Sequence, residues 1–188
     1  IFIGWSRVGF GGKSYDRWHM GGGEIVHRNF AEKKADAERA TITSVTEWND
    51  NDGKAMLEER RTMTFRRGPG PARLLVLFTS TIEATKGEVR LGGDPEHAGI
   101  QYRPANEVER KETVYVFPGE DVDPKKDLDL PWVGETYTLG ENRYSVAQLN
   151  HPSNPDGTRF SAYRDYGRFG AFFERTIPEG EALTGKYA

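Results

Sequence analysis

The residue types that can do chemistry are most concentrated in residues 148–173. A strand-like run ends at His151, because the two prolines that follow fix their own φ and bias the preceding residues toward extended geometry. His151 is therefore expected at a strand end. After an Asp-Gly turn signal, a second extended segment collects arginines and aromatic residues: Arg159, Phe160, Tyr163, Arg164, Tyr166 and Arg168.

Arginines among aromatic rings, opposite a histidine and Asn154, suit a polyhydroxylated or anionic small ligand. Guanidinium groups present planar donors, and aromatic faces stack on sugar rings. We expect Arg159 and Arg164 to orient hydroxyl or carboxylate groups and Tyr166 to stack. The alternative is a hairpin whose arginine stems pack on the sheet while their charges are solvated.

A second turn, in residues 93–99, places His97 just ahead of a strand that carries Arg103. This repeats the order of His151 and Arg159, so the two units can converge. We predict that His97, His151, Arg103 and Arg164 line one concave face. His97 and His151 are the candidate general acid/base groups, since imidazole titrates near neutrality. The alternative for His97 is a hydrogen-bonded turn residue.

Two glycine clusters near the start of the chain enclose the string SYDRWHM, residues 14–20. Glycine-bounded aromatic and ionisable residues suit a loop at a binding mouth, where Trp18 would stack on a ligand. The alternative is an ordinary ordered loop anchored by Trp18. The string GFGGKS lacks the spacing of a phosphate-binding loop, and no helix pattern follows it.

Three long strings, LNHPSNPDGTRFSAYRDYGRFGAFF, GDPEHAGIQYR and IFIGWSRVGFGGKSYDRWHM, resemble a planctomycete-type bacterial family that carries the label methane oxygenase PmoA and is uncharacterised in function. The similarity covers nearly the whole chain. The resemblance implies the antiparallel supersandwich of galactose-mutarotase-like proteins, export from the cytoplasm and a link to sugar catabolism. Family members carry a histidine-rich segment upstream, so an N-terminal portion is expected to be missing here.

Composition excludes several classes of function. The 188-residue chain has 26 basic and 29 acidic residues, and this near-balance argues against nonspecific nucleic-acid binding. The absence of cysteine excludes disulfides, thiolate metal sites and a cysteine nucleophile. The best apolar run, residues 74–82, is far shorter than the about 20 residues of a spanning helix, so we expect no membrane span.

Metal and cofactor chemistry is weakly signalled. The four histidines, His19, His27, His97 and His151, form no HExxH or His-x-His pair, so any metal site would need convergence through folding. We therefore expect no metal, copper included, and no cofactor. A GxSxG nucleophile elbow is also absent.

Short segments separated by turn signals predict one domain, residues 1–188, with an all-β antiparallel sandwich fold. Residues 31–39 alternate in charge without an apolar stripe and are expected to be a solvated connection, and residues 118–131 a surface loop. The expected strands are residues 1–5, 24–30, 41–48, 54–66, 73–82, 88–91, 100–103, 114–117, 132–139 and 143–149.

These features favour a periplasmic or secreted, carbohydrate-active protein that performs acid/base chemistry on a sugar or sugar derivative. Its partner would be a small molecule or an oligosaccharide. The first alternative is a noncatalytic sugar-binding or interaction domain. The second is a copper-dependent oxygenase, which the label of the resembling family suggests.

Overall fold

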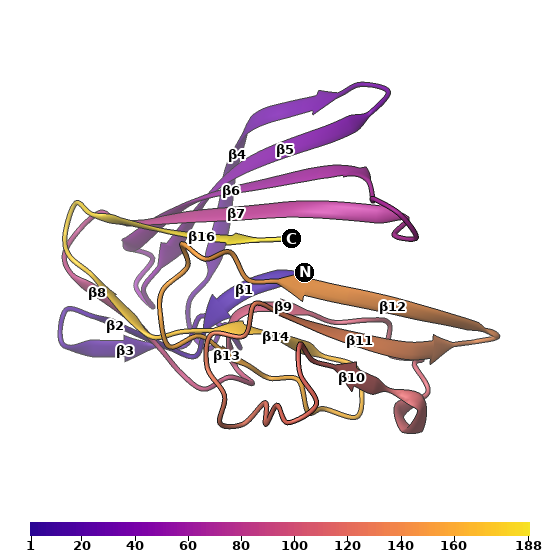
Figure 1. Cartoon of the computed structure of the whole chain (residues 1–188). Coiled ribbons are helices and arrows are strands. Elements are labelled where there is room, and N and C mark those ends of the chain that lie inside the picture. The colour runs from indigo at the N-terminus through magenta and orange to yellow at the C-terminus, as the bar shows by residue number, and fades with distance from the viewer.

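The four longest strands and the shorter β16 form a five-stranded antiparallel sheet in the order β16-β7-β6-β5-β4. The computed structural model, which describes residues 1–188, places this sheet as one layer of the molecule, at the top of Figure 1. β-Branched and aromatic residues suit such half-buried pleated strands. The strands are β4 Ile25–Ala35, β5 Arg39–Asn49, β6 Ala55–Arg67, β7 Leu74–Ala84 and β16 Ala182–Tyr187.

The facing layer contains three smaller antiparallel sheets, in the orders β1-β9-β14-β13, β15-β8-β2-β3 and β10-β11-β12. A 3-10 turn, η1 Arg110–Glu112, is the one helical element, and the chain forms no apolar helix of membrane-spanning length. The strands are β1 Phe2–Trp5, β2 Arg7–Phe10, β3 Lys13–Tyr15, β8 Val89–Gly92, β9 Ala98–Tyr102, β10 Val114–Val116, β11 Trp132–Leu139, β12 Asn142–Leu149, β13 Arg159–Phe160, β14 Phe169–Phe172 and β15 Arg175–Ile177.

Aromatic side chains join the two layers. The Trp5 ring lies 5.9 Å from the Trp48 ring of the large sheet and 5.6 Å from the Phe173 ring, centroid to centroid. Trp5 Nε1 also donates to the Phe173 carbonyl oxygen at 3.0 Å, so its polar atom is paired in the core. Because all three side chains are buried, replacing Trp5 with alanine is expected to cost about 3–5 kcal/mol of folding free energy.

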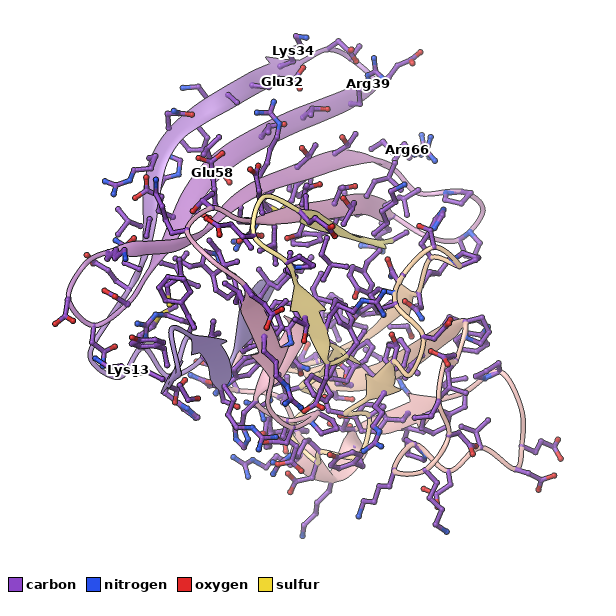
Figure 2. All side chains as sticks on the ribbon, turned by 90° about the vertical axis from the view of Figure 1, so that its left-hand side faces the viewer. Lys13, Glu32, Lys34, Arg39, Glu58 and Arg66 are labelled. Carbon is purple, nitrogen blue, oxygen red and sulfur yellow. The ribbon has the colours of Figure 1, made fainter.

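The large sheet also buries one carboxylate. Glu59 is fully buried and accepts hydrogen bonds from Trp48 Nε1 at 3.0 Å and Ser80 Oγ at 2.7 Å. Arg61 completes the group through Nη2 at 2.7 Å. Removing any one of these partners would leave a buried charge incompletely paired and would destabilise the fold. The opposite face of the sheet carries solvated charges, among them Glu32, Lys34, Glu58 and Arg66 (Figure 2).

The predicted all-β antiparallel sandwich is confirmed, and one predicted connection is wrong. Residues 31–35 do not form a solvated loop, because β4 continues to Ala35 and pairs with β5 along its length. Two register shifts, between His27 and Asn29 and between Phe30 and Glu32, interrupt this pairing. Bulges and charged side chains are common on edge strands, where they discourage pairing with other chains. The charge pattern therefore marks an exposed edge of the sheet.

Candidate functional site

The loop after β3 holds a histidine against a carboxylate. Asp16 Oδ1 accepts hydrogen bonds from the backbone N–H groups of Trp18 and His19, at 2.9 and 2.8 Å. Asp16 Oδ2 lies 2.7 Å from His19 Nδ1. Partial burial opposes ionisation of Asp16, but these bonds from His19 and Trp18 outweigh it and lower the pKa of the carboxyl. The string Asp-x-x-His thus folds into a turn that fixes one side of the His19 ring.

The turn between β8 and β9 repeats this arrangement. Asp94 Oδ1 accepts the backbone N–H of Glu96 at 2.9 Å and lies 3.0 Å from His97 Nδ1. The His97 backbone N–H donates to the Asp94 carbonyl oxygen at 3.1 Å. We call each of these turns, Asp16–His19 and Asp94–His97, an Asp-x-x-His unit. Neither ring makes a hydrogen bond through Nε2.

Strand pairing brings the two units together. β1 pairs with β9, with Trp5 opposite Ala98, so the start of β9 lies beside the end of β1. The buried Arg17 holds the loop after β3 against neighbouring strands. Its backbone N–H donates to the Trp5 carbonyl oxygen at 2.9 Å, and its side-chain Nε donates to the Asn49 carbonyl oxygen at 2.6 Å. A Cβ on Gly4 would lie 2.3 Å from the Arg17 carbonyl oxygen, so only glycine permits this approach.

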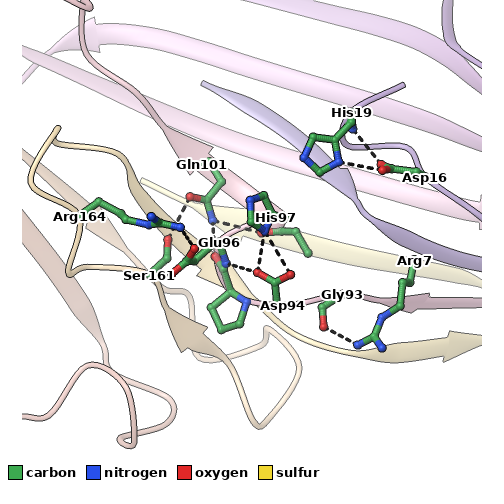
Figure 3. Close-up of polar contacts among 12 residues, drawn as sticks. Arg7, Asp16, His19, Gly93, Asp94, Glu96, His97, Gln101, Ser161 and Arg164 are labelled. Carbon is green, nitrogen blue, oxygen red and sulfur yellow. Dashed lines mark hydrogen bonds and ion pairs between the residues drawn. The ribbon is translucent and has the colours of Figure 1, made fainter. Parts of the chain in front are cut away.

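As a result, His19 and His97 face each other although they lie far apart in sequence. Their ring centroids are 5.3 Å apart with the planes tilted by 38°. The Trp18 ring stands edge-on to His97 at 6.2 Å. Figure 3 shows each histidine joined to its own aspartate.

The loop between β13 and β14 adds arginines and an aromatic ring. Arg164 forms an ion pair with Glu96 (Figure 3). The Arg168 guanidinium lies 5.7 Å from the Trp18 ring centroid and 5.5 Å from that of Tyr166. We name Trp18, His97, Arg164, Tyr166 and Arg168 the arginine–histidine cluster. Its members come from three segments of the chain: the loop after β3, the turn between β8 and β9, and the loop between β13 and β14.

Arg168 is the most unusual member of the arginine–histidine cluster. Only 8 % of the residue is exposed, yet its guanidinium forms no ion pair with a carboxylate, and its Nε atom has no hydrogen-bond partner. Burial lowers the pKa of Arg168, and the neighbouring charges of Arg164 and Arg103 act in the same direction. A cation held in this way attracts an anionic ligand.

Hydrogen bonds from β9 and β10 hold the loops on either side of the cluster in place. Gln101 Nε2 donates to the carbonyl oxygens of Pro95 and Ala98, at 3.2 and 3.1 Å, and its Oε1 accepts from Ser161 Oγ at 3.0 Å. Tyr115 in β10 donates its hydroxyl to the Arg164 carbonyl oxygen at 2.7 Å. β9 therefore braces both the loop that carries His97 and the loop that carries Arg164, and β10 adds a contact to the second loop.

A buried carboxyl lies beneath the arginine loop. Glu135 in β11 is 1 % exposed, and neither carboxyl oxygen has a hydrogen-bond partner. A Cβ on Gly167 would lie 3.4 Å from both oxygens, so the loop backbone covers this carboxyl closely. Burial raises the pKa of Glu135 to about 8. The side chain is therefore held as the neutral acid at neutral pH.

A surface hollow of about 390 Å³ adjoins the arginine–histidine cluster through Tyr166. Arg103 lines it and donates to Asn106 Oδ1 at 2.8 Å. Another hollow, of about 420 Å³, is formed by residues 175–178 and 181–183. No histidine or aromatic ring lines that second hollow, so we place the candidate site at the cluster.

The structure does not bring all the predicted site residues together. His97, Arg164, Tyr166 and Trp18 meet in the cluster, and Arg103 borders it. By contrast, no contact joins His151, Asn154 or Arg159 to the cluster. His151 bonds to Ser153 and Asn154 to β16, while the exposed Arg159 makes no side-chain hydrogen bond or ion pair.

Sequence reasoning placed Asp16 and His19 in a candidate binding loop without giving them a role, and it missed Asp94 and Glu135. The repeated Asp-x-x-His string was a visible signal for the first three, since an aspartate that begins a turn commonly bonds to groups two or three residues on. For Glu135, the signal in the sequence was its position two residues from Val133 and from Tyr137 in an expected strand, which puts the three side chains on one face.

Comparison with known proteins places the whole chain in one family. A family model matches residues 1–188. The chain belongs to DUF6807, a family of unknown function. No curated protein matches the chain, and no solved structure matches it either. For this DUF6807 member, function has to be argued from the geometry of the site.

Proposed function

We propose that this protein is an extracytoplasmic, carbohydrate-active protein that performs acid/base chemistry on a sugar or sugar derivative at the arginine–histidine cluster. The observation that carries the proposal is the buried guanidinium of Arg168, which has no carboxylate partner and lies 5.7 Å from the Trp18 ring centroid and 5.5 Å from that of Tyr166. A cation close to two aromatic rings suits an anionic ring such as a sugar acid, which offers a carboxylate and an apolar face.

The residues of the cluster take distinct roles in this proposal. Arg168 binds the ligand carboxylate, and Arg164 binds hydroxyl groups next to it. Trp18 and Tyr166 stack on the ring. His97 transfers the proton, because Asp94 occupies its Nδ1 and leaves Nε2 free for the ligand.

A noncatalytic sugar-binding module is the second candidate. The observation that favours it is exposure: 34 % of the His97 side chain is accessible to solvent. Proton transfer is most effective where water is excluded, whereas binding tolerates an open surface.

The sequence resemblance bears on the same proposal. A galactose-mutarotase-like architecture and the label methane oxygenase PmoA belong to the family that the sequence strings resemble. The architecture favours a sugar ligand, which agrees with the arginine and aromatic groups. The label favours copper chemistry, which is a third proposal and would require bound copper.

The test is a ligand screen followed by detection of chemical change. Neutral sugars, uronic acids and aldonic acids are added at one concentration, and the shift in melting temperature is measured. A ligand that binds only the native state raises the melting temperature by mass action. We expect sugar acids to stabilise the protein more than the neutral sugars of the same size.

Each stabilising ligand is then followed by NMR with wild-type protein and with His97→Ala. Conversion by wild type that is lost in His97→Ala, with stabilisation retained, supports the enzyme. Stabilisation without conversion supports the binding module. If no sugar shifts the melting temperature, the proposal fails.

A further inference from the structure

The two Asp-x-x-His units share a feature that proton transfer by His97 does not require. In both, an aspartate occupies Nδ1 and leaves Nε2 without a partner. Histidines that bind metals almost always donate their other ring N–H to a carboxylate, a backbone carbonyl or water, which fixes the tautomer and makes the free nitrogen more basic. Two such units on adjoining loops thus present two prepared nitrogen ligands.

The remaining histidines lack this arrangement. His27 packs against the Phe30 ring at 4.5 Å and has no carboxylate on its ring. His151 Nδ1 is bonded to the Ser153 hydroxyl at 2.8 Å. The carboxylate-bound form is therefore confined to the two histidines that face each other.

The separation of the two rings fits one shared ion. Zinc–imidazole bonds are about 2.0–2.1 Å long, and a tetrahedral angle between two of them puts the ring centroids about 5 Å apart. The observed separation of the His19 and His97 centroids is 5.3 Å. Direct stacking does not explain this pair, because the planes are tilted by 38°.

A third ligand lies in the second unit. One potential ligand atom from each of Asp94, Glu96 and His97 falls within 4.8 Å of the other two. His19 lies outside this group. Asp94 is engaged with the His97 ring, so Glu96 is the carboxylate that would have to turn toward the two histidines to reach an ion. Its present partner is Arg164, and that cation lies beside Tyr166.

We propose that His19 and His97 bind one divalent first-row transition ion, such as Zn²⁺, through their Nε2 atoms, with the Glu96 carboxylate as the third ligand. Asp16 and Asp94 orient the two rings. The remaining coordination positions are open to water or to a ligand oxygen, as in metal sites that act on substrates.

This inference goes beyond the proposed function and does not rest on it. An ion at this place would border Trp18, whose ring stands edge-on to His97. His97 would then hold the ion, and a water on the ion would take over proton transfer. Because the metal can be tested without any sugar, failure of one proposal is distinguishable from failure of the other.

The experiment is calorimetric titration of chelator-stripped protein with ZnCl₂ alone at neutral pH. We expect one ion per chain. His19→Ala and His97→Ala should each weaken binding more than about 10-fold, since even loss of an outer partner costs about 10–100-fold. Asp94→Asn should fall in that 10–100-fold range. His27→Ala is the matched control, which removes a histidine outside the site and should bind like wild type.

A second measurement protects the test from misfolding. Melting curves without metal establish that each variant is folded, and the visible absorption of Co²⁺ bound to wild type reports nitrogen ligands independently of any variant. No zinc binding by wild type, wild-type affinity in either His19→Ala or His97→Ala, or an equal loss in His27→Ala would each overturn the proposal.

Discussion

His97 and His151 occupy similar positions in the chain and very different surroundings. Each follows a strand, and a proline lies within two residues of each. His97 bonds to an aspartate, faces another histidine and belongs to the arginine–histidine cluster. His151 bonds to Ser153 within its own turn, and the neighbouring Asn154 ties that turn to β16. A histidine at a strand end therefore becomes part of a candidate site only where other segments of the chain converge on it.

The largest expected effect that distinguishes His97 from His151 is on the rate of turnover of the ligand found by the sugar screen. His97→Ala should lower the rate about 10²–10⁴-fold, which is the usual contribution of a positioned acid/base group. His151→Ala should lower it far less. Both rates are measured by NMR at saturating ligand. The reverse order would transfer the catalytic role to His151.

The second prediction concerns the buried carboxyl beneath the arginine loop. The pKa of Glu135 is about 8 in the folded protein, against an ordinary value of 4.5. Between these two pH values the folded protein holds a proton on Glu135 that the unfolded chain has released. The free energy of unfolding therefore falls as pH rises from about 4.5 to about 8. Each unit of pKa difference corresponds to about 1.4 kcal/mol, as an upper bound for this site.

Glu135→Gln, which cannot ionise, should flatten that pH dependence. Melting temperatures between pH 4.5 and pH 8.5 provide the measurement, and the variant should be more stable than wild type at the alkaline end. Glu59→Gln is the matched control, because it removes a buried carboxylate that has hydrogen-bond partners, and it should destabilise the protein instead. Parallel pH curves for wild type and Glu135→Gln would contradict the prediction.

The third prediction addresses the His151 turn as a structural element. Asn154 Nδ2 donates to Asn150 Oδ1 and to the Lys186 carbonyl, both at 2.7 Å, and its Oδ1 accepts the Lys186 N–H at 2.8 Å. Asn154→Ala leaves Asn150 Oδ1 and the Lys186 N–H without these partners, while the Lys186 carbonyl keeps the His151 N–H at 3.3 Å, and it should lower the free energy of unfolding by about 2–3 kcal/mol. Urea denaturation gives the value. A change below about 0.5 kcal/mol, typical of surface positions, would show that the turn is not anchored in this way.

The smallest expected effect distinguishes an arginine inside the arginine–histidine cluster, Arg168, from an exposed arginine outside it, Arg159. Arg168→Gln should weaken binding of a sugar acid at least about 10-fold, because a hydrogen bond to a charged group contributes about 1.5–3 kcal/mol. Arg159→Gln makes the same change of charge on an exposed side chain without partners, and should leave affinity nearly unchanged. Calorimetry with the best sugar acid measures both. Equal losses would mean that general surface charge, rather than the cluster, attracts the ligand.

Local pattern was enough to predict most of the fold. The apolar run that predicts a strand over residues 73–82 became β7, and the turn signal at residues 49–53 separates β5 from β6. These features depend on neighbouring residues alone. The connection predicted at residues 31–39 was wrong over residues 31–35, because an edge strand tolerates charges on both faces, which periodicity cannot distinguish from a loop.

The candidate site was predicted only in part, for a different reason. His97, Arg164, Tyr166 and Trp18 stand out by residue type, and the structure brings them together. The pairing of His97 with His19 depends on the register between β1 and β9, and no local pattern specifies that register. Spacing along the chain therefore predicted no metal site, although the folded chain places two histidines face to face.

The position of β9 between β1 and β14 has a consequence for the order of folding. One edge of β9 pairs with a strand far upstream in the sequence and the other with a strand far downstream. Contacts of such sequence separation form slowly, since loop closure precedes any gain from packing. The histidine pair and the arginine loop would thus meet only after both long-range pairings have formed. Binding of a metal ion or a sugar at this place would therefore be a late event in folding.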